Sequence, residues 1–491
     1  MFLGIDLGTS SLKAVLLDGS GTSIAEAAVP LNTSIPRPGW SEQDPDAWWA
    51  AFLKALNALR EQQSRAFRAV RALGLSGQMH AAVLVDEAGN AIRPAILWND
   101  SRAVRECDEL QGAVPDLPSV AGIVAMPGFT APKLLWLRRH EPESVRLLWK
   151  VLPAKDFLRL RLTGEAATDM SDAAGTLWLD EKARDWSDAI LSAAGLDRAA
   201  MPTLVEGSVA AGSIRAELLQ ELGFEQPVVL AGGGGDVAAA AISVGAVAGG
   251  DALISLGTSA QFFVADEEYR PQPSSLLHAF AHALPQRWYR MAAMLNGVSC
   301  LDWVARIVGG GDIGELLDRC QGVYRGPSRV LFLPYLAGER KPHNDPRARG
   351  VFVGLDHTVA DVDLVQAALE GVAFSLLEAR RLMETSGLAP EAVAAVGGGA
   401  RNRFATQLMA NVLGMPVVRY AGSGNGPAFG AARLARMALT GETSGEVCVR
   451  PPLLDILDPD SALAATYGER FETWRRLYPA LKSAFGLRSA L

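Results

Sequence analysis

The sequence contains only 4 cysteines in 491 residues, and none of them forms a CxxC pair. Closely spaced cysteine pairs are typical of zinc sites, and small disulfide scaffolds are much richer in cysteine. We therefore expect reduced thiols, with neither a structural zinc ion nor a disulfide framework. The four residues are Cys107, Cys300, Cys320 and Cys448.

Long apolar runs and a basic excess are also missing. Asp6 interrupts the first apolar run before it could form the core of a signal peptide. The longest uncharged candidate for a membrane span, residues 237–250, is short and rich in Ala and Gly. The 46 basic residues are outnumbered by 54 acidic ones, for a net charge of −8, which argues against general binding to nucleic acid or anionic membranes. We expect a cytoplasmic protein with neither partner.

The chain does have ample material for large cores, because 49% of its residues are apolar, and its length predicts two to four domains. A repeated motif narrows this expectation. The sequence Leu-Gly-Thr-Ser occurs at residues 7–10 and again at residues 256–259, each time between strand-like runs. Each copy predicts a β-hairpin whose glycine permits a tight turn and whose amides and hydroxyls can bind an anion.

A second element also recurs. Residues 228–231 lead into glycines 232–235 and an Ala-rich stretch, and residues 394–396 lead into glycines 397–399 and the amphipathic run 402–413. Both are typical of a strand, a glycine turn and a helix whose positive end faces a ligand. We predict an α/β fold of two related lobes, residues 1–246 and 247–491, with a cleft between them. Chance repetition is the alternative, because the chain has 49 glycines.

Two carboxylates are placed for chemistry. Asp6 precedes the first hairpin turn and Lys13 follows it, a suitable place for hydrated magnesium, whereas Ser255 replaces Asp6 in the second copy. Asp236 stands where a glycine turn enters a helix, so it could serve as a general base toward an alcohol. The alternatives are structural: Asp6 could cap its turn, and Asp236 could be a helix N-cap.

Two polar clusters follow strand-like runs. Residues 77–80 read Gly-Gln-Met-His, and residues 98–102 read Trp-Asn-Asp-Ser-Arg. Gln78 and His80, with the loop amides, are suited to binding sugar hydroxyls, although a lone histidine is more often a packing or surface residue.

These motifs together resemble the superfold of actin, sugar kinases and seventy-kilodalton heat-shock ATPases, built from two ribonuclease H-like lobes. Within it, residues 128–140 and residues 350–371 are similar to the two signatures of the FGGY carbohydrate kinases. Further stretches resemble the members that phosphorylate D-xylulose, whose product enters the pentose phosphate pathway. They are residues 40–45, 77–80, 94–100, 169–176 and 282–288.

The resemblance implies an enzyme that uses ATP and Mg²⁺, with Asp236 as the catalytic base and Asp6 near the metal. It implies that Met79 and His80 contact the ketose, with Gln78 beside them. It further implies nucleotide contacts at two phosphate turns and at an adenosine end. These residues are Gly8, Thr9, Ser10, Lys13, Gly257, Thr258, Gly398, Gly399, Ala400 and Asn402. The expected partners are a small sugar and ATP, and a homodimer is compatible with the pattern.

One residue departs from the family pattern. Val237 follows Asp236, where the D-xylulose enzymes commonly carry an asparagine that reaches the sugar. Valine cannot donate a side-chain hydrogen bond, so the choice of ketopentose stays open. The alternatives are a kinase for ribulose, glycerol or another polyol, an actin-like or chaperone-like ATPase, and a sugar sensor without turnover.

Overall fold

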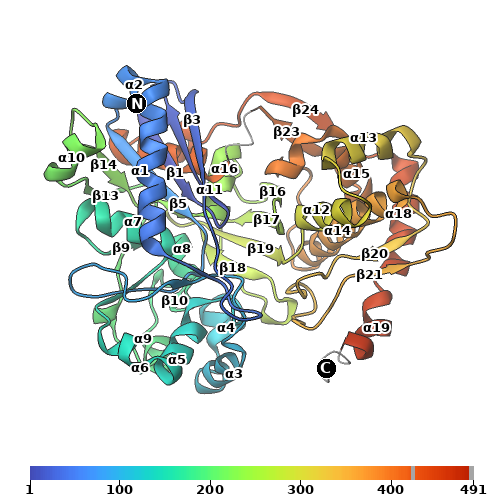
Figure 1. The fold of residues 1–491 in the computed structure, drawn as a ribbon, viewed down its shortest axis with the longest axis horizontal. Coiled ribbons are helices and arrows are strands. Elements are labelled where there is room, and N and C mark those ends of the chain that lie inside the picture. The colour runs from blue at the N-terminus through green and yellow to red at the C-terminus, as the bar shows by residue number, and fades with distance from the viewer. Residues whose placement is uncertain (422–425, 486–491) are drawn as a thin grey trace.

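The computed structural model describes residues 1–421 and 426–485 and contains two large mixed sheets, one in each half of the molecule (Figure 1). The first sheet has the order β13-β14-β5-β1-β2-β3, with β15 paired to β5. Its strands are β1 Phe2–Leu7, β2 Ser11–Leu17, β3 Ser23–Pro30, β5 Ala72–Gly77, β13 Ala210–Ser213, β14 Val229–Ala231 and β15 Gly234–Gly235. The second sheet has the order β18-β19-β17-β16-β22-β23-β24. Its strands are β16 Ala252–Leu256, β17 Ala260–Asp266, β18 His278–Ala281, β19 Trp288–Met294, β22 Val393–Val396, β23 Val417–Tyr420 and β24 Leu453–Leu457.

The two sheets share one topology. In the first, β1 forms an antiparallel hairpin with β2 and pairs in parallel with β5. In the second, β16 forms an antiparallel hairpin with β17 and pairs in parallel with β22. The prediction of two related lobes built around the repeated hairpin is therefore confirmed.

The two glycine turns, however, do not occupy equivalent positions. β22, which precedes glycines 397–399, lies directly beside the hairpin strand β16, as β5 lies beside β1. β14, which precedes glycines 232–235, lies one strand further out, beyond β5. The strand order therefore makes β5 the counterpart of β22, and β14 the counterpart of β23. The glycine runs matched strands from different places in the two sheets, because a glycine run marks where a strand ends and not which strand of the sheet it is.

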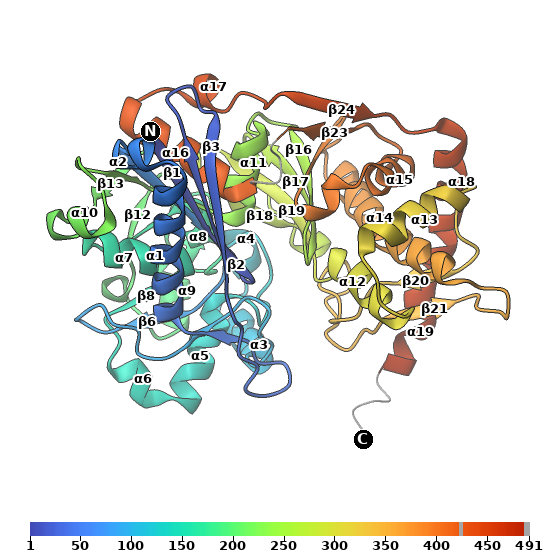
Figure 2. The same ribbon diagram turned by 45° about the horizontal axis from the view of Figure 1, so that its top comes forward.

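Two central helices join the lobes (Figures 1 and 2). Helix α11 (Asp236–Val244) follows the last strand of the first sheet, whereas α16 (Gly426–Thr440) lies between β23 and β24 of the second sheet but packs on β1 and β5 of the first and on α11. The contact is close: a Cβ on Gly4 would lie 1.9 Å from the Ala428 carbonyl oxygen, and one on Gly430 would lie 1.8 Å from the Ala239 oxygen. Glycine is needed at both positions because backbone fills the space of a side chain. The boundary between lobes at residue 246 stays a prediction.

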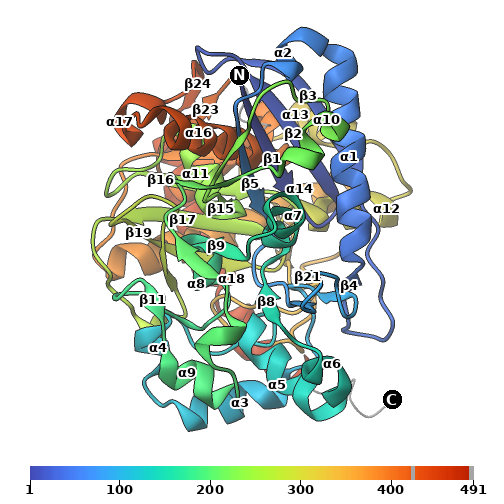
Figure 3. The same cartoon turned by 90° about the vertical axis from the view of Figure 1, so that its left-hand side faces the viewer.

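The remaining elements cover the sheets. Helix α1 (Pro45–Gln62) is capped by Asp44, as its Asp-Pro start predicts, and packs on β2 and β3 at the outer side of the first lobe (Figure 3). Its apolar stripe, including Trp48 and Phe52, is fully buried. The long helix α14 (Asp361–Thr385) forms the core of the second lobe with α12 (Val298–Ile307), α13 (Ile313–Val323) and α15 (Arg403–Leu413).

Shorter elements complete the described chain. The other strands are β4 Glu42–Gln43, β6 Val83–Val85, β7 Ala95–Ile96, β8 Lys150–Leu152, β9 Ala167–Asp169, β10 Leu179–Asp180, β11 Asp185–Trp186, β12 Thr203–Val205, β20 Leu331–Leu333 and β21 Val351–Val353. The other helices are α2 Ser64–Arg68, α3 Val104–Ala113, α4 Leu117–Val120, α5 Thr130–His140, α6 Pro142–Arg146, α7 Ala154–Thr163, α8 Met170–Ala174, α9 Asp188–Ala193, α10 Ala216–Leu222, α17 Ser444–Val447, α18 Ser461–Trp474 and α19 Leu477–Phe485. None of the described helices is long and apolar enough to span a bilayer.

Candidate active site

Asp6 lies near the end of β1, where the sheet register places it beside Lys13 of β2 and Ser76 of β5. Its side chain is buried, and its Oδ1 atom has no hydrogen-bond partner among the described residues. Burial raises the pKa of Asp6 to about 6, and the positive charge of Lys13 opposes that rise. An unpartnered, buried carboxylate oxygen is costly unless a ligand satisfies it.

Asp236 is the first residue of α11, and Gly235 occupies the N-cap position, so the N-cap alternative for Asp236 is wrong. The preceding strand β15 pairs with β5, and the Gly235 amide donates to the Ser171 hydroxyl oxygen at 2.9 Å. The Asp236 Oδ1 accepts from the Val237 amide at 2.8 Å. Burial, followed by the negative charge of Asp6, raises the pKa of Asp236 to about 7. The two predicted carboxylates are therefore electrostatic neighbours, and Asp236 is poised to exchange a proton near neutral pH.

The first hairpin forms the predicted tight turn. The Gly8 amide donates to the Ser11 carbonyl oxygen at 3.1 Å, and a Cβ at Gly8 would lie 3.0 Å from that same oxygen. Ser10 and Lys13 are exposed beside the turn. The Thr9 hydroxyl, in contrast, is already engaged: it donates to Gln78 Oε1 and accepts from the Trp98 indole, both at 2.9 Å.

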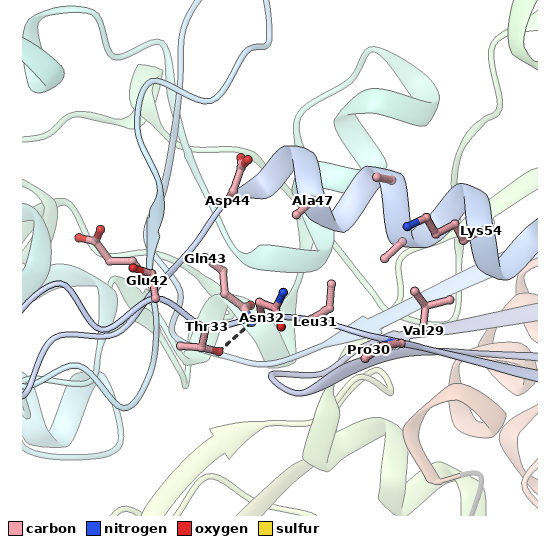
Figure 4. Close-up of a pocket in the computed structure, with 13 residues that line it drawn as sticks. Val29, Pro30, Leu31, Asn32, Thr33, Glu42, Gln43, Asp44, Ala47 and Lys54 are labelled. Atoms are coloured by element: carbon pink, nitrogen blue, oxygen red, sulfur yellow. Dashed lines mark hydrogen bonds between the residues drawn. The ribbon is translucent and has the colours of Figure 1, made fainter.

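Gln43 connects this network to the outer wall of the lobe. Its amide nitrogen donates to the Thr9 carbonyl oxygen at 2.7 Å, and its amide oxygen accepts from Gln78 at 3.0 Å and from Trp48 at 2.9 Å. Both ends of the Gln78 amide are thus occupied by protein groups. Gln78 therefore holds the hairpin in place, and its predicted contact with the sugar stays a prediction. Gln43 also lines a surface pocket of about 450 Å³ between β3 and α1, which contains none of the predicted site residues (Figure 4).

Met79 lies against Gly235, the residue before Asp236, and His80 lies against Gly175. A Cβ on Gly235 would come within 2.8 Å of Met79 Sδ, and one on Gly175 would come within 2.8 Å of His80 Nδ1. His80 Nδ1 lies 2.8 Å from the Gly175 carbonyl oxygen. Burial, together with nearby positive charges, lowers the pKa of His80 well below its usual value, so the ring is neutral. Since Nδ1 must carry the proton that faces the carbonyl, Nε2 is left as an acceptor for a hydroxyl.

Two buried lysines that the sequence analysis did not single out hold this region. Lys133 donates to the His80 carbonyl oxygen at 2.8 Å and to the Gly128 oxygen at 2.7 Å. Lys155 contacts Asp156 at 2.8 Å, Asp169 at 2.9 Å and Asp172 at 3.5 Å. Asp169 in turn accepts from the Ser171 hydroxyl, which holds the turn before Asp236. Lys133 stands among apolar residues at the start of its helix, which was an available signal, whereas Lys155 is followed by other charged residues and carries no such signal.

The predicted nucleotide residues of the second lobe lie together. The Gly257 amide donates to the Ser259 carbonyl oxygen at 3.1 Å and closes the second hairpin, leaving Thr258 exposed. Gly397, which has a φ of 91°, brings the glycine turn against Leu256 at the end of β16. The four predicted residues at the adenosine end share this turn and the start of α15; they are Gly398, Gly399, Ala400 and Asn402. The Asn402 side chain caps α15 by accepting from the Ala405 amide at 2.9 Å.

Comparison with known proteins identifies the class. The models of the FGGY family of carbohydrate kinases match this chain over residues 1–243 for the N-terminal domain and residues 252–439 for the C-terminal domain. The chain belongs to this family, as the resemblance predicted, and is therefore a carbohydrate kinase of the two-lobed sugar-kinase fold.

Individual relatives are similar over almost their whole length. The xylulose kinase of Escherichia coli K12 is 47% identical over 98% of this chain and 99% of its own, and that of Klebsiella pneumoniae is 44% identical over the same shares. Among solved structures, a Brucella ovis kinase described as a xyloylose kinase superposes with a TM-score of 0.92 at 44% identity, covering 98% of this chain and 99% of its own.

Proposed function

We propose that this chain transfers the γ-phosphoryl group of ATP to D-xylulose and releases D-xylulose 5-phosphate. The observation that carries the proposal is the proximity of Asp6 and Asp236: their strands β1 and β15 both pair with β5, and, after burial, the charge of Asp6 raises the pKa of Asp236. The choice of D-xylulose is supported by the xylulose kinases that are 44–47% identical to nearly the entire chain.

In this proposal Asp236 removes the proton from the terminal hydroxyl of the sugar as its oxygen attacks the γ-phosphorus. The bond from that phosphorus to the bridging oxygen of ADP breaks, and the proton stays on the Asp236 carboxylate until it is lost to solvent. A pKa near 7 suits this task, because the carboxylate is ionised in much of the population yet basic enough to accept a proton.

Asp6 fits a magnesium ion by the chemistry of its donor atom. Its Oδ1 is buried and unsatisfied among the described residues, and a hard oxygen donor is what magnesium prefers. No three acidic, histidine or cysteine side chains of the described chain form a preformed metal cage, which accords with an ion held by one or two carboxylates plus phosphates. Such an ion would offset the negative charge of the β- and γ-phosphates.

The sugar would lie along Met79 and His80. Neutral His80 would accept a hydroxyl proton through Nε2, and the buried Met79 thioether would supply the apolar wall. The first hairpin turn at Gly8 and Ser10, with Lys13 and the second turn at Gly257, would surround the phosphates. The predicted cytoplasmic location and the homodimer stay predictions.

A kinase for another ketopentose is the second candidate, because of one residue. Val237 is 4% exposed and directly follows Asp236, so it offers the sugar a hydrocarbon surface in place of an amide. A buried hydroxyl facing valine would lose a hydrogen bond, and that loss changes sugar preference.

A substrate panel tests the proposal. Magnesium-dependent ADP formation would be measured with D-xylulose, D-ribulose, L-ribulose, L-xylulose and glycerol at equal concentrations. We expect the highest kcat/KM with D-xylulose. A higher value with another sugar would reject the proposed substrate while retaining Asp236 as the base, and ATP turnover that no sugar stimulates would reject the proposed reaction.

A further inference from the structure

Arg340 reaches from the second lobe toward the sugar loop of the first. It belongs to the loop between β20 and β21, yet its guanidinium carbon lies 6.0 Å from the centre of the Trp98 ring. A Cβ on Gly128 would come within 3.4 Å of its Nη2 atom. Trp98 contacts Thr9 of the first hairpin, and the Gly128 carbonyl is bound by the same lysine that binds His80.

The backbone of Arg340 is anchored. Buried Glu339 accepts from the Arg340 amide at 2.8 Å and from the Leu295 amide at 2.9 Å through Oε1, and from the Asn296 side chain at 3.2 Å through Oε2. Glu339 and Asp345 also exchange two backbone hydrogen bonds, at 3.0 and 2.8 Å, which close the loop around Arg340. The loop therefore holds the backbone of Arg340 at a defined place, from which its side chain reaches Trp98.

The guanidinium itself has no hydrogen bond or ion pair with any described residue, although Arg340 is partly buried. Burial lowers the pKa of Arg340 to about 10, so the group remains charged at neutral pH. Glu339, the nearest carboxylate, is already occupied by backbone and amide donors. A fork of donors without an acceptor in a confined place is the arrangement that a polar ligand completes.

The charges around Arg340 indicate which part of a ligand it faces. Burial is the main cause that lowers the pKa of His80, and the positive charge of Arg340 is the second. The same charge also lowers the pKa of His278. The charge that raises the pKa of Asp236 is instead that of Asp6. Arg340 thus faces the His80 side of the site, away from the carboxylate that acts on the reacting hydroxyl. The other charged or titratable groups on that side are Lys133, His278 and the Asp100–Arg102 ion pair. Lys133 and His278 carry no negative charge, and the Asp100 carboxylate is already held by Arg102 at 2.7 Å.

We infer that Arg340 is a sugar-binding residue that donates to the C1 hydroxyl and C2 carbonyl of the ketose, so that the sugar bridges the two lobes. The inference rests on the proposed function, in which the C5 hydroxyl faces Asp236. It gives the second lobe a direct part in recognising the sugar, besides its predicted part in binding nucleotide. A sugar that lacks the distal hydroxyl would lose part of this contact.

The test compares Arg340→Gln, Arg340→Lys and the matched control Arg347→Gln, an exposed arginine of the same loop whose nearest carboxylate is 3.8 Å away. Each variant would be assayed with D-xylulose and with 1-deoxy-D-xylulose, and its Tm measured. We expect Arg340→Gln to raise the KM for D-xylulose on the order of 10- to 100-fold, because a charge-assisted hydrogen bond is lost. The KM of Arg340→Lys should lie between those of the wild type and Arg340→Gln, and the KM of Arg347→Gln should equal that of the wild type. The ratio of the KM of Arg340→Gln to that of the wild type should be smaller with 1-deoxy-D-xylulose, because removing the C1 hydroxyl and removing the guanidinium abolish the same contact.

Three results would overturn the inference. An unchanged sugar KM in Arg340→Gln, with or without a lower Tm, would make the residue only a contact between the lobes. A raised KM for ATP with an unchanged KM for sugar would make it a phosphate ligand. Equal penalties with both sugars would exclude the C1 end. The proposed function fails separately, if the wild type prefers another sugar of the panel. In that case the variants are compared again with the preferred sugar. A wild type that uses none of the sugars contradicts both the proposed function and the inference about Arg340.

Discussion

The pH dependence of turnover follows from the environment of Asp236. An ordinary aspartate, with a pKa of 3.8, would be ionised throughout the range from pH 5.5 to 8.5, whereas burial and Asp6 raise the pKa of Asp236 to about 7. A base must be ionised to act, so about half of the enzyme is competent at pH 7, and about a tenth at pH 6. We therefore expect kcat/KM to fall about fivefold from pH 7 to pH 6, to fall about tenfold for each pH unit below 6, and to level off above pH 8.

The suitable quantity is kcat/KM for ATP at saturating sugar with magnesium in excess, because it reports protonation before nucleotide and metal enter. Enzyme held at each pH and then assayed at pH 7.5 controls for inactivation, and doubled coupling enzyme controls for the detection system. A profile that is flat from pH 5.5 to 8.5 would refute the reasoning, since it would mean that the reacting carboxylate has an ordinary pKa. A rate that falls as pH rises through 7 would refute the base assignment itself.

Four further outcomes are expected. Asp6→Asn should raise the magnesium concentration for half-maximal ADP formation about tenfold or more, and an unchanged magnesium titration would remove this residue from the metal site. Val237→Asn should change the ratio of kcat/KM for D-xylulose over D-ribulose about tenfold or more, whereas an unchanged ratio would show that the position does not contact the sugar. Gly430→Ala should lower stability by about 1–3 kcal/mol or more in calorimetry, because its Cβ would lie 1.8 Å from a carbonyl oxygen of α11. The matched control is Gly468→Ala in helix α18, where no atom lies within 4 Å of the new Cβ, and this change should not lower stability in that way. Equal losses of stability in the two variants would contradict the packing argument. The raised pKa of Asp236 means that the folded state binds more protons than the unfolded state, so the contribution of this carboxyl to stability falls as pH rises from about 4 to 7. Asp236→Asn removes this loss, so the difference in Tm between the variant and the wild type should grow in favour of the variant from pH 5 to pH 8.

The repeated hairpin and the two carboxylates could be predicted because their signals are local. Leu-Gly-Thr-Ser forms a turn between two strands at both places where it occurs. Asp6 lies beside the first of these turns, and Asp236 directly follows a run of glycines. The glycine turns misled for the same reason: a glycine run shows that a strand ends but not where that strand lies in its sheet. β14 and β22 look alike in sequence yet occupy different sheet positions.

Other features depend on contacts between residues far apart in the chain. Nothing near Gly426 indicates that α16 packs on the first sheet; the evidence lies in Gly4, more than 400 residues away, whose missing side chain makes room for it. The inward direction of the Thr9 hydroxyl depends on Gln78 and Trp98, which the fold brings to it. Hydrogen-bond partners of this kind become visible only once the strands are placed.

The central claim is that Asp236 acts as the base in a sugar-dependent phosphoryl transfer. Its most direct test is D-xylulose-dependent ADP formation by wild type and by Asp236→Asn, with ATP affinity measured in parallel. We predict that the variant binds ATP almost as the wild type does but turns over at least on the order of a hundredfold more slowly. Near-normal turnover by Asp236→Asn would contradict the account.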